Sequence, residues 1–300
     1  MTIVLGVDAG GTRTVAAVAR GNEVLARREG TAGAVRPGRA MAAANAIAST
    51  ARQALHATGQ LRAAVLVVGA AGVGREEERH ALRDALRLEN LADRVLVTTD
   101  IAIALRAALG TTPGMVLLAG TGSFAVAQRP DGTQVRQGGY GWRMGDEGSA
   151  YGLGHAALRA VGRAEGGRGE ATVLTAALQR QTRSARFDDL VRWSVVASPA
   201  EVAALAPAVL TAAESGDAVA SALVREAAGA LTSLARALRP TLPGAGAVPV
   251  ALAGGMMGFA SYRAAVLEQL AQVPGLQVRE TTVDPVQGAL ALARDAIPAA

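Results

Sequence analysis

The stretch IVLGVDAGGTRTVAAV, residues 3–18, contains the pattern that decides the fold of this chain. Two apolar runs rich in valine, at 2–8 and 13–19, flank a short segment with paired glycines and an aspartate. The runs predict two strands, and the glycines predict a tight turn between them. The turn has two interpretations: a plain hairpin in which Asp8 and the glycines satisfy turn geometry, or a loop that holds a phosphate group.

The same design occurs a second time in MVLLAGTGSFAVAQRPDGTQVRQGG, residues 115–139. It again consists of an apolar strand, a turn with glycine and threonine, a second strand, a turn at PDG and a third strand. In the first copy the second turn is RGNE, residues 20–23, and the third strand runs through Arg28. The two copies agree in order and spacing, so a duplicated unit is the economical explanation.

Alternating helices and strands follow both copies. After the first copy we expect a helix, a strand, a helix, a strand and a helix, at 39–57, 63–72, 75–89, 94–100 and 101–110. After the second we expect a long helical stretch at 148–239 and a strand at 248–255, followed by a helix, a short strand at 276–280 and a final helix from Pro285. This order predicts an α/β protein with mostly parallel sheets. A boundary at TTPG divides it into domains 1–113 and 114–300, of which the second carries a helical insertion.

The composition excludes several classes of protein. All 30 basic residues are arginines, and without lysine the chain can be neither a Walker A protein nor a protein kinase nor a Schiff-base enzyme. Without cysteine it holds no disulfide, thiol nucleophile or cysteine-bound cluster. The arginines are scattered and only 3% of residues are aromatic, which argues against nucleic-acid binding. We find no signal peptide and no membrane span in the sequence and expect a cytoplasmic protein.

The residues of the first turn suit a phosphate and a metal ion. Gly10 and Gly11 let backbone N–H groups approach an anion, and the hydroxyl of Thr12 and the charge of Arg13 add to the attraction. Asp8, at the end of its strand, suits a magnesium ion held through water. The turn alone does not decide between this hypothesis and the plain hairpin.

Two further segments carry candidate functional residues. Asp100 ends a buried strand and opens a helix, so it is either the N-cap of that helix or a base at the ligand-binding edge of the sheet. The segment GGYGWRMGDEGSAYGLG, residues 138–154, mixes Tyr140, Trp142 and Asp146 among glycines. Apolar faces with a few polar groups suit a sugar or another small polar ligand.

The motifs GVDAGGTRT, TTDIA, GTGS, GDEGSAYGLG, LAGG and DPVQGALALAR occur in this order. In that order they resemble the N-acetylglucosamine kinase and glucosamine kinase group of the benzoyl-CoA reductase ATPase-type family, within the actin, hexokinase and Hsp70 superfamily. The resemblance spans nearly the whole chain. It implies two ribonuclease-H-like domains with a duplicated β-β-β-α-β-α core, a nucleotide cleft, and a last helix that could pack back on the first domain. It also implies ATP and magnesium as cofactors and an amino sugar phosphorylated at a primary hydroxyl.

The resemblance also implies roles for individual residues. Those that would bind ATP are Asp8, Gly10, Gly11, Thr12, Arg13, Thr121, Gly122, Gly254 and Gly255. Those that would contact the sugar are Ser123, Gly139, Tyr140 and Asp146. Asp100 would match the catalytic base, which accepts the proton of the sugar hydroxyl.

The chain departs from the pattern at three positions around the sugar. Ala34 stands where N-acetylglucosamine-specific members carry an asparagine, Phe124 follows GTGS, and Tyr140 replaces a tryptophan. The identity of the sugar therefore stays open. Two other functions also stay open: a sugar or nucleotide sensor without turnover, and an ATPase activator of a dehydratase, which the absence of cysteine disfavours. Dimers are common among relatives of this kind, so a homodimer is a further open outcome.

Overall fold

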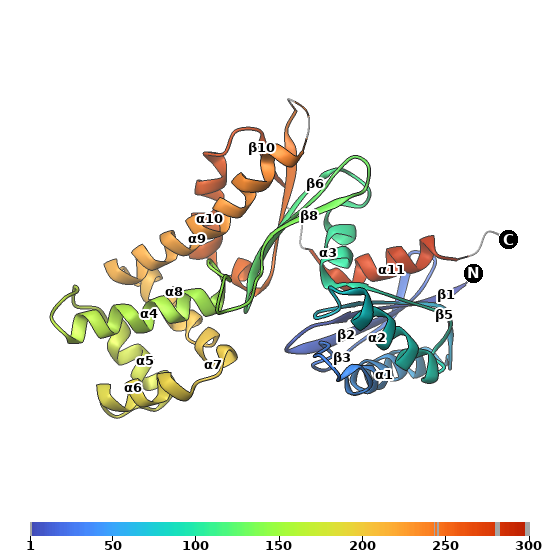
Figure 1. Cartoon of the computed structure of the whole chain (residues 1–300), viewed down its shortest axis with the longest axis horizontal. Coiled ribbons are helices and arrows are strands. Elements are labelled where there is room, and N and C mark those ends of the chain that lie inside the picture. The colour runs from blue at the N-terminus through green and yellow to red at the C-terminus, as the bar shows by residue number, and fades with distance from the viewer. Residues whose placement is uncertain (1, 243, 245, 280–282, 298–300) are drawn as a thin grey trace. The chain divides into compact units, whose positions relative to one another are not determined.

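The computed structural model describes residues 2–242, 244, 246–279 and 283–297 (Figure 1). The chain forms two compact units. The first comprises Met1–Thr111 and Thr282–Ala300, and the second comprises Thr112–Thr281. The C-terminal helix is thus grouped with the first unit, on which the resemblance allowed it to pack back.

The first unit is built on a five-stranded sheet with the order β3-β2-β1-β4-β5. Its strands are β1 (Ile3–Ala9), β2 (Arg13–Arg20), β3 (Glu23–Thr31), β4 (Ala63–Ala70) and β5 (Ala92–Thr99). The first three strands are antiparallel, and β4 and β5 run parallel to β1. Its helices are α1 (Ala40–His56), α2 (Glu76–Leu88), α3 (Asp100–Leu109) and α11 (Pro285–Asp295).

The second unit repeats this topology. Its sheet has the order β10-β9-β6-β7-β8, which is the order of the first sheet read from the other edge. The strands are β6 (Gly114–Ala119), β7 (Ser123–Gln128), β8 (Gln134–Gly138), β9 (Val248–Ala253) and β10 (Leu276–Arg279). The duplication expected from the two glycine-threonine turns is therefore present in the structure.

The helical stretch expected at 148–239 is divided into separate helices: glycines follow α4 and α8, a left-handed Arg183 ends α5, and prolines stand in the first turns of α7 and α8. These helices are α4 (Ala150–Glu165), α5 (Leu174–Thr182), α6 (Phe187–Val196), α7 (Pro199–Ala203), α8 (Ala206–Glu214) and α9 (Ala218–Leu238). The remaining elements of the unit are α10 (Ala260–Ala271) and the short 3-10 helices η1 (Arg239–Thr241) and η2 (Gly255–Gly258).

One segment of the second unit, Ala218–Thr241, is long and apolar enough to cross a membrane. Its core is α9, whose buried face carries Leu223, Leu231 and Leu238 and joins the main hydrophobic core of the unit. A core helix of a folded protein passes the same test of length and composition. The burial of these leucines therefore explains its apolar character without a membrane.

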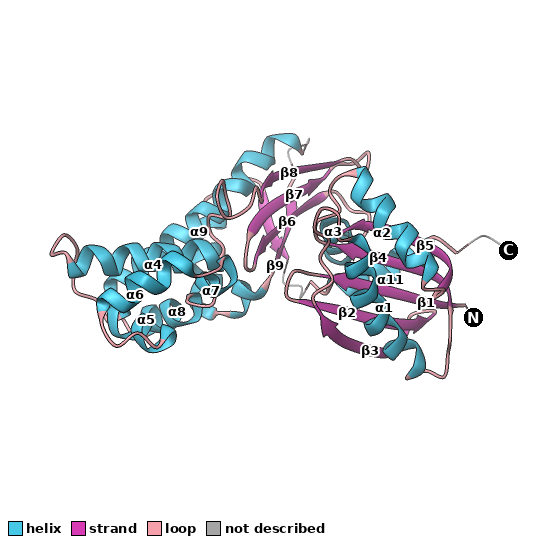
Figure 2. Ribbon diagram, turned by 60° about the horizontal axis from the view of Figure 1, so that its bottom comes forward, coloured by secondary structure: helices cyan, strands magenta, loops and turns pink. Residues whose placement is uncertain are grey.

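Helices cover both faces of the first sheet (Figure 2). Glycine allows two of these contacts to be made backbone to backbone. A Cβ atom on Gly6 in β1 would lie 2.8 Å from the backbone nitrogen of Leu290 in α11. A Cβ atom on Gly288 in α11 would lie 1.8 Å from the carbonyl oxygen of Ile103 in α3. The C-terminal helix is therefore packed directly against the first strand and against the helix that starts at Asp100.

Candidate active site

Charged side chains gather at one end of the first sheet, on the face that α11 covers. Asp8 lies two residues after Gly6 in β1, so it points to the same face. Asp8 of β1 lies opposite Val15 of β2, which lies opposite Glu29 of β3. Gly6 of β1 is aligned in the same way, across β2, with Arg27 of β3. Because α11 begins only at Pro285, the sheet surface beyond its start carries this polar group.

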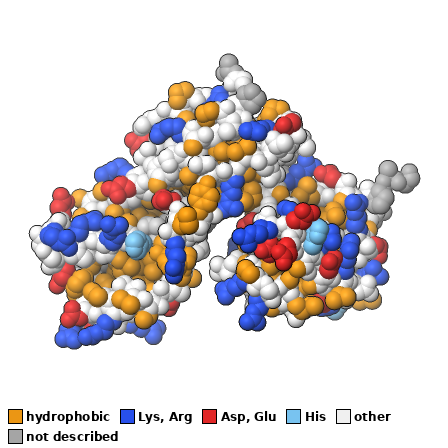
Figure 3. All heavy atoms as spheres, in the orientation of Figure 1, with side chains coloured by type: hydrophobic (Ala, Val, Ile, Leu, Met, Phe, Trp, Pro, Cys, Tyr) orange, Lys and Arg blue, Asp and Glu red, His pale blue; other side chains and the backbone are white. Residues whose placement is uncertain are grey.

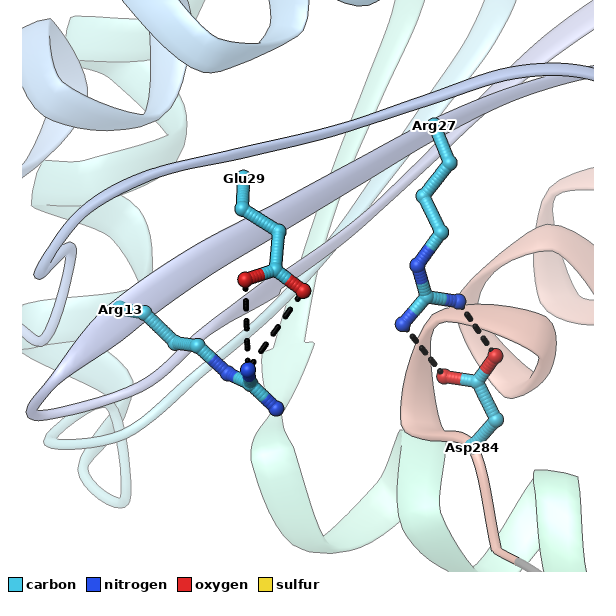
Figure 4. A network of polar contacts seen from close by, with 4 residues as sticks. All are labelled: Arg13, Arg27, Glu29 and Asp284. Atoms are coloured by element: carbon cyan, nitrogen blue, oxygen red, sulfur yellow. Dashed lines mark hydrogen bonds and ion pairs between the residues drawn. The ribbon is translucent and has the colours of Figure 1, made fainter.

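Two ion pairs organise the polar group (Figure 4). The guanidinium of Arg27 donates to both carboxylate oxygens of Asp284, with N···O distances of 2.5 and 3.3 Å. Arg13 Nη1 lies 3.2 and 3.5 Å from the two oxygens of Glu29. Asp284 is the N-cap residue of α11, but its side chain accepts no capping bond there. The carboxylate of Asp284 therefore connects α11 to β3.

The environment of Asp8 raises its pKa from 3.8 to about 6. Burial is the largest cause, and the negative charges of Asp100 and Asp284 act in the same direction. The positive charges of Arg13 and Arg27 act in the opposite direction. Asp8 is thus a carboxylate in a region of excess negative charge, where a bound cation would stabilise its ionised form.

The structure separates the two interpretations of Asp100. The N-cap of α3 is Thr99, whose Oγ1 accepts a hydrogen bond of 3.1 Å from the amide of Ala102. Asp100 is the first residue of the helix, and its Oδ1 accepts from the amide of Ile101 at 3.0 Å. The capping role thus falls to Thr99, and Asp100 stays close enough to raise the pKa of Asp8.

The residues around Asp8 suit a magnesium ion bound largely by other ligands. Within the described residues, no group of three or more His, Asp or Glu side chains is arranged to hold a metal ion. Magnesium commonly keeps several waters and binds through one or two carboxylates and substrate phosphates. The cation-favouring charge at Asp8 fits that mode of binding, with Asp8 as the protein group that would hold the ion through water.

The two glycines of the first turn have less crowded surroundings than the glycines that the fold requires. A Cβ atom on Gly10 would lie 3.2 Å from the carbonyl oxygen of Arg13, and one on Gly11 would have no atom within 4 Å. Gly11 and Thr12 are exposed. The amide of Ala34 donates to the Gly10 carbonyl oxygen at 3.2 Å, so the position expected to read the sugar lies beside this turn.

In the second unit the GTGS turn is bound to the start of α4. The amides of Ala150 and Tyr151 donate to the carbonyl oxygens of Gly120 and Thr121, at 2.8 and 3.2 Å. Beside these bonds, a Cβ atom on Gly122 would lie 2.9 Å from Oδ1 of Asp146. The turn and the segment that precedes α4 therefore form one packed group.

Hydrogen bonds from Ser123 fix the position of Asp146 and of the residue that follows it. Its Oδ1 accepts a hydrogen bond of 3.2 Å from the amide of Ser123, and its backbone adopts a left-handed φ of 65°. Ser123 is 1% exposed, and its hydroxyl donates to the carbonyl oxygen of Glu147 at 2.6 Å. The hydroxyl of the buried Tyr262 donates to the carbonyl oxygen of Gly148. Burial raises the pKa of Asp146, and the bond from Ser123 opposes that shift.

The other residues expected to contact the sugar are placed differently. Phe124 is buried, with the guanidinium carbon of Arg136 5.1 Å from its ring centre. Arg136 also donates to the carbonyl oxygens of Gly138 and Gly139, at 3.1 and 2.6 Å. Tyr140 is 64% exposed. Phe124 and Arg136 therefore anchor the start of the loop, and Tyr140 is available to a ligand.

The glycines of LAGG also divide into two kinds. Gly254 has a φ of 96°, and a Cβ atom there would lie 2.2 Å from the carbonyl oxygen of Ala119. The fold therefore requires glycine at this position. A Cβ atom on Gly255 would have no atom within 4 Å.

The structure brings together residues that the motifs suggested and some that they did not. Asp8 and Asp100 interact in the first unit, and Ser123 and Asp146 do so in the second. Arg27 and Asp284 are not among the site residues predicted from the sequence, although Asp284 opens the motif DPVQGALALAR. An aspartate followed by proline at the first helical position was a signal that could have pointed to Asp284.

Comparisons with known proteins agree with these features. An N-acetylmuramic acid/N-acetylglucosamine kinase from Clostridium acetobutylicum is 30% identical over 165 residues, which cover 54% of this chain and 54% of that protein. The chain thus spans about half the length of that relative. An N-acetyl-D-glucosamine kinase from Dictyostelium discoideum is 27% identical over 238 residues, which cover 76% of this chain and 74% of that protein.

The crystal structure of a candidate N-acetylglucosamine kinase from Chromobacterium violaceum superposes with a TM-score of 0.82. It is 32% identical, and the match covers 98% of this chain and 99% of that chain. This likeness confirms the predicted α/β fold of the actin-like ATPase type. The names of the three relatives support the prediction of an ATP-dependent carbohydrate kinase. The model of the BadF/BadG/BcrA/BcrD ATPase family matches residues 5–293, and the chain belongs to this family.

Proposed function

We propose that the protein is a cytoplasmic kinase that transfers a phosphoryl group from ATP to a primary hydroxyl of an amino sugar. The substrate would be N-acetylglucosamine, glucosamine or a relative of these sugars. The observation that carries the proposal is the buried position of Asp8 beside Asp100: burial, together with the negative charges of Asp100 and Asp284, raises the pKa of Asp8 to about 6. The kinase names of the relatives support the same reaction.

Asp100 is the proposed general base. It lies just beyond the carboxyl end of β5, the edge at which open α/β sheets bind ligands. The hydroxyl oxygen forms a bond to the terminal phosphorus of ATP while the bond from that phosphorus to the bridging oxygen breaks, and Asp100 accepts the hydroxyl proton. In a loose transition state the proton leaves late, so a carboxylate suffices as the base.

Asp8 would hold a magnesium ion through water. Bound magnesium neutralises negative charge on the phosphates and so favours transfer. The region around Asp8 carries the carboxylates of Asp100 and Asp284, and its excess negative charge attracts a cation without a preformed cage. Arg13, the first residue of β2 after the turn, can add positive charge near the phosphates.

Backbone groups replace the missing lysine in the proposed phosphate sites. Gly11 and Gly255 both leave open space where a Cβ atom would be, and neither has a left-handed φ. The fold alone therefore does not explain glycine there, whereas close approach of a ligand to the backbone does. We assign Gly11 and Gly255 to the ATP site on this argument, and the family motifs add Gly10, Thr12, Thr121, Gly122 and Gly254.

The sugar is assigned to the loop that bears Asp146. Asp146 and Tyr140 are the proposed contacts, because the first carries a carboxylate and the second an exposed ring. Ser123 and Gly139 would act by positioning, since the Ser123 hydroxyl is engaged with Glu147 and a Cβ on Gly139 would lie 2.0 Å from Arg136 Nη2. Ala34 has no side-chain amide, so the C2 substituent of the sugar would be only weakly selected.

Replacing the proposed base tests the reaction. In a coupled assay of ADP release over a panel of hexoses and amino sugars, we expect Asp100→Asn to lower kcat by about 10²- to 10⁴-fold because proton removal is lost. The matched control is Asp93→Asn, the same change at the opposite, exposed end of β5. Asp93→Asn should keep wild-type turnover. Unchanged turnover in Asp100→Asn would remove Asp100 as the base.

The raised pKa of Asp8 predicts a pH-dependent gain in stability on neutralisation. The pKa of Asp8 is about 6 in the folded protein, against an ordinary value of 3.8. Its contribution to stability is therefore fully present below pH 4, where the carboxyl is protonated, and is lost as pH rises through 6, because the buried carboxyl group then carries a charge. We expect Asp8→Asn to raise the unfolding free energy of the ligand-free protein by about 1–2 kcal/mol at pH 8 and not at pH 4. Urea unfolding at both values measures this, and a loss of stability at pH 8 would contradict it.

The two kinds of glycine predict opposite outcomes on substitution. Gly11→Ala should leave the melting temperature unchanged, because its Cβ has open space, and should raise KM for ATP by about tenfold or more. Gly254→Ala should lose about 2–4 kcal/mol of stability, because of its left-handed φ and its contact with Ala119. Thermal denaturation and ATP kinetics separate the two. A wild-type KM in Gly11→Ala would contradict the phosphate role of the first turn.

A further inference from the structure

Tyr262 is a buried tyrosine to which the sites described above give no role. It is 0% exposed and lies in the first turn of α10, the helix that follows η2. The chain has three tyrosines, of which Tyr140 is 64% exposed and Tyr151 is half-buried. A phenol that is withdrawn from water needs a partner for its hydroxyl. The hydroxyl of Tyr262 donates to the carbonyl oxygen of Gly148.

The acceptor belongs to the segment 146–149, in which successive carbonyl oxygens are bound. The carbonyl oxygens of residues 146–148 each accept a hydrogen bond. Their donors, in chain order, are the amide of Ser149 at 3.1 Å, the hydroxyl of Ser123 at 2.6 Å and the hydroxyl of Tyr262. The first donor belongs to the segment itself and the second to the GTGS turn. Tyr262 thus connects the segment to a third element, α10.

The segment 146–149 also has an unusual backbone conformation. Asp146 has a left-handed φ of 65°, and Gly148 has one of 82°. A residue other than glycine is uncommon in this region, and its surroundings must hold it there. A Cβ atom on Gly148 would lie 2.7 Å from the carbonyl oxygen of Ala227 and 2.9 Å from the amide nitrogen of Leu231, so the segment is packed against α9. This contact and the bound carbonyls together keep Asp146 left-handed.

The two carboxylate oxygens of Asp146 have different surroundings. Oδ1 accepts the hydrogen bond of 3.2 Å from the amide of Ser123. Oδ2 accepts no hydrogen bond from the residues that the structure describes. It can therefore accept one from a sugar hydroxyl, and a bond to a charged acceptor is among the stronger ones. Because the side chain moves with its backbone, a change of φ at Asp146 would displace Oδ2.

The hydroxyl of Tyr262 contributes something that its ring does not. The ring belongs to the main hydrophobic core of the second unit, together with Val266 of α10. The start of α4 is fixed independently, because Ser149 is its N-cap and accepts the amide of Gly152 at 3.0 Å. Burial raises the pKa of Tyr262, so the hydroxyl stays protonated and can donate. The specific contribution of the hydroxyl is therefore its bond to Gly148.

We propose that Tyr262 is a positioning residue for the sugar: its hydroxyl, through Gly148, holds the backbone of Asp146 in the conformation that presents the carboxylate to a sugar hydroxyl. This step rests on the proposed function, in which Asp146 contacts the sugar. Tyr262 is fully buried and does not touch the sugar itself. Its effect therefore passes through Asp146 and appears in sugar binding, whereas ATP binding is unaffected.

Tyr262→Phe tests the proposal with a small change, because the ring stays in the core and only the hydroxyl is lost. We expect KM for the sugar, and its dissociation constant measured by calorimetry without ATP, to rise about tenfold, since binding must then order the segment 146–149. KM for ATP should keep its wild-type value, because the packing of α10 is retained. The difference between the two KM values separates positioning from a general loss of structure.

A double-mutant cycle shows whether Tyr262 acts through Asp146. Asp146→Asn keeps a residue that tolerates the left-handed conformation and removes the charge of the carboxylate. Alone, this change should raise the dissociation constant of the sugar by about tenfold or more, because a charged acceptor is lost. The double variant should bind the sugar no more weakly than Asp146→Asn, since the two side chains act as one unit.

Tyr151→Phe is the matched control, with the same chemical change on α4. The surface of α4 carries a histidine and a row of basic side chains, with hydrophobic side chains beside them (Figure 3). The ring of Tyr151 stacks on the histidine of α4, His155, with ring centres 5.8 Å apart. Its hydroxyl forms no hydrogen bond within the described part of the chain. Tyr151→Phe should therefore match the wild type in sugar affinity.

Hydrogen exchange measures the segment without any ligand and so does not depend on the proposed function. In ligand-free Tyr262→Phe, the amides of residues 146–151 should exchange about tenfold faster than in the wild type, because the segment opens more often. The amides of α10 should keep their wild-type rates. In Tyr151→Phe both regions should exchange as in the wild type.

Two results would overturn the proposal: wild-type sugar affinity in Tyr262→Phe, or a double variant in which the losses of the two single variants add. A wild type that neither binds nor phosphorylates any sugar would count against the proposed function. Faster exchange at 146–151 in Tyr262→Phe would in that case still support the hydroxyl as the group that holds Asp146 in place.

Discussion

The backbone contact of α11 with β1 and α3 is the interaction on which the rest of the first unit depends. Glycine at positions 6 and 288 removes the Cβ atoms that would collide with Leu290 and Ile103. The last helix of the chain can therefore reach the first strand, and its N-terminus lies on the face to which Asp8 points. Without this packing, Asp284 would not add its charge to that of Asp8 and Asp100.

The resulting group of charges is costly to the protein without ligands. Asp8 is partly withdrawn from water, the negative charges of Asp100 and Asp284 oppose its ionisation, and Arg13 and Arg27 offset only part of these effects. Electrostatic repulsion of this kind is common at binding sites, where the bound ligand relieves it. A cation with a polyphosphate supplies both signs of charge and fits this arrangement. The second unit differs, since its loop around Asp146 is stabilised by hydrogen bonds from Ser123 and Tyr262.

Periodicity and glycine placement were sufficient to predict the duplicated strands, the parallel additions to each sheet and the helix from Pro285. They were not sufficient to divide the helical region after residue 148, since alanine-rich segments favour helix on both sides of each break. Thr99 and Asp100 are both good capping residues, so only the geometry could decide between them. The Arg27–Asp284 pair joins residues 257 positions apart, and no local pattern reports such a contact. Sequence motifs do not report solvent exposure, so they could not show that Ser123 is buried and Tyr140 is exposed.

Phosphorus NMR of the products tests the central claim most directly, because it shows where the phosphoryl group goes. With ATP, magnesium and N-acetylglucosamine or glucosamine, the account predicts a sugar phosphomonoester in an amount equal to ADP, with its coupling to the protons of a primary carbon. Inorganic phosphate in place of the sugar ester would contradict the account and indicate an ATPase. ATP that stays intact with every sugar of the panel would likewise contradict it and indicate a binding protein.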